Sequence, residues 1–214
     1  SGALSFTLTY EDLAGNAGAS VSDTDTTNNS KVTFDTTAPT LSGIQLVSTN
    51  AKDSSRYAKK DDDLILTFTS SEAIPAPTVT FAGSSLTAED TSSGSRTSWR
   101  VTRPVVAGDT GDVAFSISYS DPTGNAGESR DESSVQNTIT MDTTAPTLPE
   151  VSLSSNNPLD TSLAKATETV TLTVRSHEPL HSLTLVKPDD STKPLDPVGS
   201  EGTQWTLSKT IETG

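Results

Sequence analysis

Acidic residues recur beside turn signals at three widely separated places in this chain. Asp35 precedes the segment TTAP, and Glu72 lies in SSEAI. Asp121 and Asn125 both lie in SDPTGNAG. Carboxylate and amide oxygens are the donors that calcium takes, about 6–8 of them at about 2.3–2.6 Å. These residues predict a calcium site if the fold brings the three segments together.

Each of these polar motifs occurs a second time in the sequence. FDTTAPT from Phe34 returns as MDTTAPT from Met141, 107 positions later, and YEDLAGNAG from Tyr10 returns as YSDPTGNAG from Tyr119, 109 positions later. Two further pairs are both 106 positions apart: AKKDDDLILTFTSSEAI at 58 with AKATETVTLTVRSHEPL at 164, and SWRV at 98 with QWTL at 204. Pairs in register at this spacing indicate tandem domains of about 107 residues.

The repeat predicts three parts. Residues 36–142 form one complete repeat. Residues 1–35 match the last two strands of a repeat, and residues 143–214 match about its first five strands. Alone, the first part would leave apolar residues such as Phe6 and Leu8 unburied. We expect its partners in adjacent repeats of a longer chain or in strands of neighbouring copies.

Alternating apolar residues predict the fold class. Short runs with period-two alternation indicate half-buried antiparallel strands. We expect seven strands in the complete repeat, at 41–48, 63–70, 77–83, 85–90, 97–104, 112–120 and 134–141. Seven such strands predict an all-β protein of tandem immunoglobulin-like antiparallel β-sandwiches. Because the chain has no cysteine, Trp99 and other aromatic residues must fill the core.

In such a sandwich the acidic motifs gather at one end. The linker with Asp35, the loop with Glu72, and the loop with Asp121 and Asn125 all lie there. An ion at this joint would hold neighbouring domains at a fixed angle. The alternative is structural: DPTGN is a tight-turn sequence, and Glu72 is then a solvated charge. The recurrence of the acidic residues favours calcium, because a turn needs no remote glutamate.

Other residues are weaker candidates. The matching candidates are Asp142, at the end of the complete repeat, with Glu178 for the third module, and Asp12 with Asn16 for the first. Asp109 and Asp112 lie at the opposite end of the complete repeat and are alternative ligands. The run 61–63 is predicted to be a solvated charge cluster.

Several function classes are disfavoured. The net charge of −14 disfavours binding to nucleic acid and to anionic membranes. No apolar run reaches membrane-spanning length. His177 and His181 have a zinc-like spacing only on a helix, and Pro179 argues against one. No histidine–acid pair is placed to activate a serine, so we do not expect an enzyme. Asn28 in NNS fits the N-glycosylation pattern.

The ordered set of DTTAPT linkers, SE loops and DxxGN turns in a unit of about 107 residues resembles the bacterial immunoglobulin-like repeats of large surface adhesins. It is more loosely similar to cadherin-like modules. The resemblance implies extracellular tandem arrays with calcium at the domain joints, bound by Asp35, Glu72, Asp121 and Asn125. Arg175 and His177 beside Glu178 depart from the pattern.

These patterns predict a structural role. We expect calcium-rigidified modules in the stalk or filament shaft of a large cell-surface protein, with neighbouring repeats or copies of the chain as partners. The alternative is a module that itself binds a glycan or protein. With aromatic residues at only 5% of the chain, little remains to form an exposed binding platform.

Overall fold

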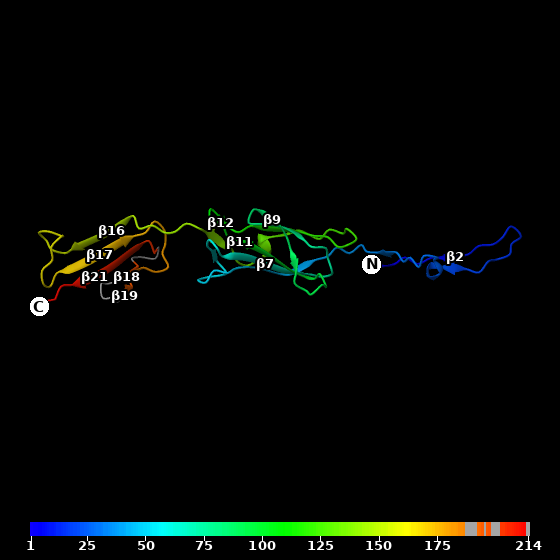
Figure 1. The fold of residues 1–214 in the computed structure, drawn as a ribbon, viewed down its shortest axis with the longest axis horizontal. Helices are drawn as coiled ribbons and strands as arrows, with labels where there is room; N and C mark the ends of the chain where they lie inside the picture. Colours follow the sequence, from blue (N-terminus) through cyan, green and yellow to red (C-terminus); the bar gives the residue numbers. More distant parts are fainter. Residues whose placement is uncertain (187–191, 195, 198–201, 213–214) are drawn as a thin grey trace. The chain divides into compact units, whose positions relative to one another are not determined.

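The structure is a computed structural model that divides by its contacts into two units, residues 1–143 and 144–214. The residues that it describes are 1–186, 192–194, 196–197 and 202–212. Their regular elements are β-strands and two short 3₁₀ helices (Figure 1). None of the described helices is long and apolar enough to cross a membrane. The prediction of an all-β protein with several antiparallel sheets is confirmed.

The first unit contains a four-stranded antiparallel sheet with its longest strands. In spatial order these are β10 (Glu89–Asp90), β11 (Ser98–Pro104), β7 (Asp63–Ser70) and β5 (Leu41–Ser48). Leu64, Leu66 and Phe68 of β7 are buried and alternate with more exposed residues. This alternation buries one face of each strand. The predicted strands 41–48 and 63–70 are confirmed at both ends.

A second four-stranded antiparallel sheet faces the same core. Its order is β14 (Arg130–Asp131), β13 (Phe115–Ser118), β8 (Thr78–Phe81) and β9 (Ser84–Thr87). Ala82 and Gly83 join β8 to β9 with φ of 45° and 78°. Two positive φ angles are typical of the tight turns that match the twist of a hairpin.

A three-stranded sheet corrects the prediction that all pairing is antiparallel. Its order is β12 (Thr110–Asp112), β15 (Thr140–Asp142) and β6 (Tyr57–Ala58). The β6 and β15 strands are parallel, and the Thr140 N–H donates to the Arg56 carbonyl at 2.8 Å. The alternation of a two-residue strand carries no information about its direction.

The complete repeat holds eleven short strands, β5 to β15, where seven were predicted. The predicted strands 85–90 and 112–120 are each two strands, since the chain passes from one sheet to another within each of them. The predicted strand 134–141 is wrong over most of its length. Glu132–Ser134 form a 3₁₀ helix, η2, whose start is capped by the Asp131 side chain accepting from the Ser133 N–H, and β15 begins only at Thr140.

One apolar core joins these sheets. It contains Leu66 and Trp99 from the first sheet, Phe115 and Ile117 from the second, and Met141 from the third. The predicted burial of Trp99 is confirmed, at 2% exposure. A single core shared by several sheets fixes the loops at their ends, including those with the acidic motifs.

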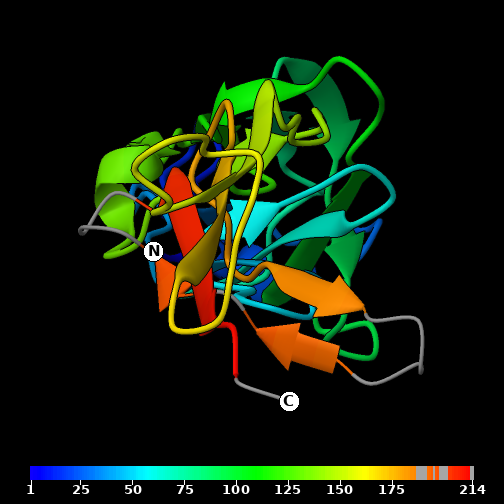
Figure 2. The same ribbon diagram turned by 90° about the vertical axis from the view of Figure 1, so that its left-hand side faces the viewer.

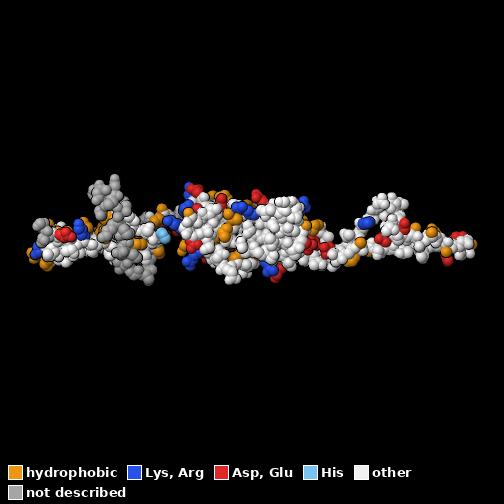
Figure 3. Space-filling view, turned by 90° about the horizontal axis from the view of Figure 1, so that it is seen from below, with side chains coloured by type: hydrophobic (Ala, Val, Ile, Leu, Met, Phe, Trp, Pro, Cys, Tyr) orange, Lys and Arg blue, Asp and Glu red, His pale blue; other side chains and the backbone are white. Residues whose placement is uncertain are grey.

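Residues 1–35, here called the N-terminal segment, form two short ladders. These are β1 (Gly2–Ala3) with β4 (Thr33–Phe34), and β2 (Thr7–Leu8) with β3 (Val21–Ser22), which leads into the 3₁₀ helix η1 (Asp23–Asp25). Phe6 and Leu8 are 40% and 55% exposed, as expected of this segment alone. Figure 3 shows apolar side chains, in orange, along the surface of the segment.

The second unit is a smaller set of strands. Its sheet has the order β16 (Glu150–Ser155), β17 (Thr169–Arg175), β21 (Gln204–Thr210) and β20 (Asp196–Pro197), and a separate hairpin pairs β18 (Thr184–Val186) with β19 (Thr192–Pro194). Figure 2 shows β17 in yellow beside β21 in red, and the hairpin in orange. Val174 and Trp205 are the buried centre of its apolar cluster.

Candidate metal centre

The linker after Asp35 is held against the loop that follows β7. The Thr40 N–H donates to the Ser71 hydroxyl at 3.0 Å, and the Ser71 N–H donates to the Thr40 carbonyl at 2.9 Å. The Ser70 hydroxyl donates to the Glu72 carbonyl at 2.6 Å, and the Pro39 ring is fully buried. These contacts place Asp35 and Glu72, which are 37 positions apart, at one end of the module.

The third acidic residue lies in a tight turn after β13. The Asp121 carboxylate accepts hydrogen bonds from the Thr123 and Asn125 N–H groups at 2.8 and 2.9 Å. Gly124 has φ of +97°, a conformation that glycine adopts without strain. The predicted turn chemistry of this sequence is therefore present, and it orients the Asp121 side chain.

The Asn125 side chain ties this turn to the linker. Its amide nitrogen donates to Asp121 Oδ2 at 2.7 Å and to the Asp35 carbonyl at 3.0 Å. Gly127 lets the Tyr119 ring and the Pro39 carbonyl lie close to its backbone. A Cβ at this position would be 2.1 Å from the ring and 2.8 Å from the carbonyl. In this geometry Asn125 holds the two segments together through its nitrogen. Ligation through its oxygen stays a prediction.

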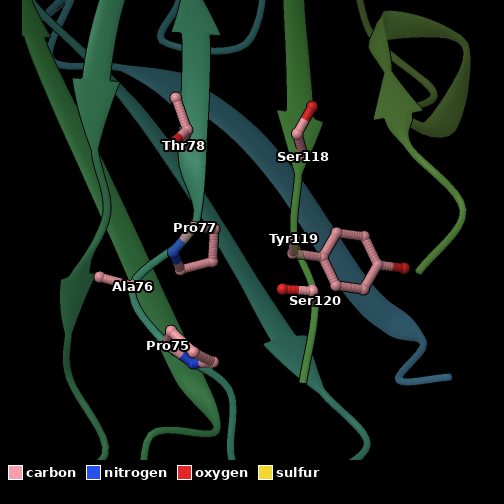
Figure 4. Close-up of a pocket in the computed structure, with 7 residues that line it drawn as sticks. All are labelled: Pro75, Ala76, Pro77, Thr78, Ser118, Tyr119 and Ser120. Carbon is pink, nitrogen blue, oxygen red and sulfur yellow. The ribbon is translucent and has the colours of Figure 1, made fainter. Parts of the chain in front are cut away.

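The strands that carry these loops are direct neighbours. Ser118 of β13 pairs with Thr78 of β8. Figure 4 shows Pro75 and Pro77 running beside Tyr119 and Ser120, which directly precede Asp121. The loop that contains Glu72 therefore leads into β8, and the turn that contains Asp121 follows its neighbour β13.

The structure brings the carboxylates of Asp35, Glu72 and Asp121 together. One oxygen from each lies within 4.8 Å of the other two. Two oxygens bound to the same calcium ion lie at most about 5 Å apart, twice the usual bond length. Asp121 is 3% exposed, and the other two are half-buried. The separation and the donor type both fit a single hard divalent cation.

The described residues supply no basic partner for this cluster. In the part of the chain that the structure describes, no Lys or Arg forms a salt bridge with any of the three carboxylates. Burial raises the pKa of Asp121. The hydrogen bonds that its carboxylate accepts from Asn125 and Thr123 outweigh this effect and lower the pKa to about 2. Asp121 is thus a carboxylate at neutral pH, beside two others. A bound cation would remove the repulsion among them.

The Asp121 hydrogen bonds predict an acid-sensitive module. Because the folded pKa of about 2 is below the ordinary value of 3.8, this contribution to stability is complete above about pH 4 and is lost as the pH falls toward 2. In calcium-free buffer, the unfolding free energy of Asp121→Asn should fall less steeply over this range than that of the parent chain. Urea unfolding at a series of pH values measures both slopes, and equal slopes would contradict the prediction.

The alternative ligands at the opposite end have other partners. Asp109 forms a two-pronged salt bridge with Arg103, with Nη2 to Oδ1 at 2.9 Å, and this pairing lowers the pKa of Asp109. Asp112 accepts from the Thr140 hydroxyl at 2.7 Å. An arginine paired with Asp109 competes with any cation there, so we leave these two residues out of the proposed centre.

The remaining predicted site residues are not members of this cluster. Asp142 is in β15 of the first unit, whereas Glu178 is in the second unit, half-buried. Asp12 accepts from the Asn16 side chain at 2.7 Å, as Asp121 does from Asn125. Asn28 is exposed, and its glycosylation stays a prediction.

One buried acidic residue was not anticipated as such. Asp62, predicted to be solvated, is 5% exposed and accepts from the Asn50 side chain and the Lys59 N–H at 2.8 and 2.9 Å. Glu168 is bonded in the same way, by Asn157 and Lys165. The lysine three positions before each of these acids, Lys59 before Asp62 and Lys165 before Glu168, was the available signal.

Comparison of the chain with protein-family models, curated proteins and solved structures gave no match. The structure itself defines an all-β protein with a cluster of three acidic side chains that could hold a metal ion.

Proposed function

We propose that the chain is a structural segment of an extracellular protein, built from tandem immunoglobulin-like β-sandwiches that calcium stiffens at their joints. The supporting observation is the convergence of Asp35, Glu72 and Asp121 without a basic partner in the described residues. Asp35 belongs to the linker that enters the module, so an ion there would restrain the linker. The bound ion would be calcium, because all the donors are hard oxygens and the chain has no thiol.

The sandwich architecture is supported by the shared core. Leu66 and Val101 of one four-stranded sheet pack in the same cluster as Val79 and Ile117 of the other. Two antiparallel sheets that bury one face each against a common core are typical of a sandwich. The sequence repeat supports extending this architecture to the neighbouring copies of the unit.

Such modules would serve as the stalk of a surface adhesin or the shaft of a surface filament. Ion-locked joints turn a flexible string of domains into a rod, which holds a distal element away from the cell. No described feature favours the alternative of direct glycan or protein binding over this role. The resemblance to bacterial adhesin repeats stays part of the proposal.

Calcium removal tests the proposal. A ligand that binds only the folded state stabilises it by about 2.7 kcal/mol at 100 times its Kd, which is roughly 10 °C in melting temperature for a module of this size. We expect scanning calorimetry to show this rise in calcium relative to EDTA, and small-angle scattering to show a longer, less flexible particle. If melting temperature and particle length are both unchanged in EDTA, the joint is not ion-locked.

A further inference from the structure

The N-terminal segment repeats the pairing of residues 110–142. LSFTLTY at 4–10 aligns with VAFSISY at 113–119, and VTF at 32–34 aligns with ITM at 139–141. The backbone ladders also match. Gly2 pairs with Phe34 as Gly111 pairs with Met141. The second ladder has the same register as its counterpart: Leu8 of β2 pairs with Val21 of β3, as Ile117 of β13 pairs with Arg130 of β14. The segment is therefore already folded like its counterpart.

The two sets of apolar side chains differ in burial. Six side chains of residues 113–141 lie in the core, each at most 8% exposed: Val113, Phe115, Ile117, Tyr119, Ile139 and Met141. Their six counterparts are all at least 40% exposed: Leu4, Phe6, Leu8, Tyr10, Val32 and Phe34. The N-terminal segment thus exposes the apolar face that residues 113–141 bury in the core.

The second unit has the complementary apolar face. Leu153, Leu172 and Leu207 lie opposite one another on β16, β17 and β21. The three line a hollow of about 740 Å³, and Leu153 is 69% exposed. Their counterparts in the first unit, at positions 46, 66 and 101, are buried in the core that residues 110–142 help to form.

An unpaired strand edge accompanies this face. In the first unit, β8 pairs with β9 on one side and with β13 on the other. Its counterpart β18 pairs with β19, and its other edge has no partner in the described part of the chain. The counterpart of β13 is the stretch around β2, at residues 6–9. Backbone pairing at such an edge is a common mode of strand addition.

We propose that residues 1–35 of one copy of this chain dock on residues 144–214 of a second copy and complete its module. The stretch 6–9 pairs with the edge of β18, and the six exposed apolar side chains cover the leucine row. This contact joins two different surfaces, so successive copies associate head to tail into linear polymers. The contact does not depend on the cation site. If calcium does bind the first unit, docking also brings Asp12, the counterpart of Asp121, to the module that contains Glu178.

Sedimentation velocity of the 214-residue chain in EDTA tests the contact. The chain should form oligomers whose size grows with concentration. Leu8→Glu alters the docking segment, and Leu153→Glu alters the face; both side chains are exposed, so neither change should unfold the chain. Each should weaken association at least about tenfold, as expected for charging one buried leucine position. Leu13→Glu and Leu159→Glu are matched controls at fully exposed leucines outside both surfaces, and they should associate like the parent.

Mixing the two variants identifies the geometry. The Leu153→Glu chain keeps an intact docking segment, and the Leu8→Glu chain keeps an intact face. The mixture should therefore form a one-to-one dimer that grows no further. A parent chain that is monomeric at all concentrations would overturn the proposal, as would a Leu8→Glu chain that still polymerises. Because every measurement is made in EDTA, a failure of calcium to bind leaves these outcomes unchanged, and a failure to associate leaves the calcium melting test unchanged.

Discussion

Replacing Glu72 with glutamine is expected to abolish most of the stabilisation by calcium. The substitution keeps the size of the side chain but removes one of three carboxylates and the option of two-oxygen ligation. If binding becomes about 100-fold weaker, the stabilisation at a calcium concentration of 100 times the parent Kd falls from about 2.7 to about 0.4 kcal/mol. Calorimetric melting in calcium measures the loss.

The same variant should behave differently in EDTA. Without an ion, Glu72 repels two neighbouring carboxylates, so Glu72→Gln should melt at the same temperature as the parent or higher. Glu89→Gln removes an equal charge from an exposed position on β10 and is the matched control. It should gain as much from calcium as the parent. If Glu72→Gln and Glu89→Gln gain equally, the cluster does not bind the ion.

Truncating Phe115 to alanine should strongly destabilise the first unit. The side chain is 3% exposed and belongs to the shared core, so its loss leaves a cavity. Such truncations cost about 3–5 kcal/mol. The loss can be followed by urea unfolding with Trp99 fluorescence in a Trp205→Phe background, which reports on the first unit only.

The repeat supplies a matched control for this prediction. Phe6 is the counterpart of Phe115 but is 40% exposed. At low protein concentration Phe6→Ala should change the unfolding free energy by less than about 0.5 kcal/mol, as surface substitutions usually do. Equal losses for the two variants would contradict the burial difference between these parts of the chain.

The sequence predicts the long strands and the convergence of the acidic residues for separate reasons. Strands 41–48 and 63–70 each place a face of regularly spaced apolar residues against the core, and this period is readable without neighbours. Asp35, Glu72 and Asp121 follow from the order of strands, because loops at the same end of a module lie close together. The sequence repeat supports both predictions, because corresponding strands, linkers and loops recur about 107 positions apart.

Other features depend on tertiary contacts that one strand does not encode. Passage from one sheet to another at Ala88 divides a predicted strand, and the Ala88 N–H donates to the Pro77 carbonyl at 3.1 Å. The parallel pairing of β6 with β15 joins segments more than 80 positions apart. Asp62 is in a charged run typical of solvent, yet Asn50 and Lys59 satisfy it in a buried position. Polar groups can be buried when they are hydrogen-bonded, and such partners are set by the fold.

The most direct test of the central claim is a crystal structure of the chain grown in calcium, with anomalous diffraction used to identify the ion. We expect one anomalous peak between Asp35, Glu72 and Asp121, with a carboxylate oxygen of each at about 2.3–2.6 Å. Absence of a peak there at saturating calcium, with the three side chains turned to solvent, would contradict the account.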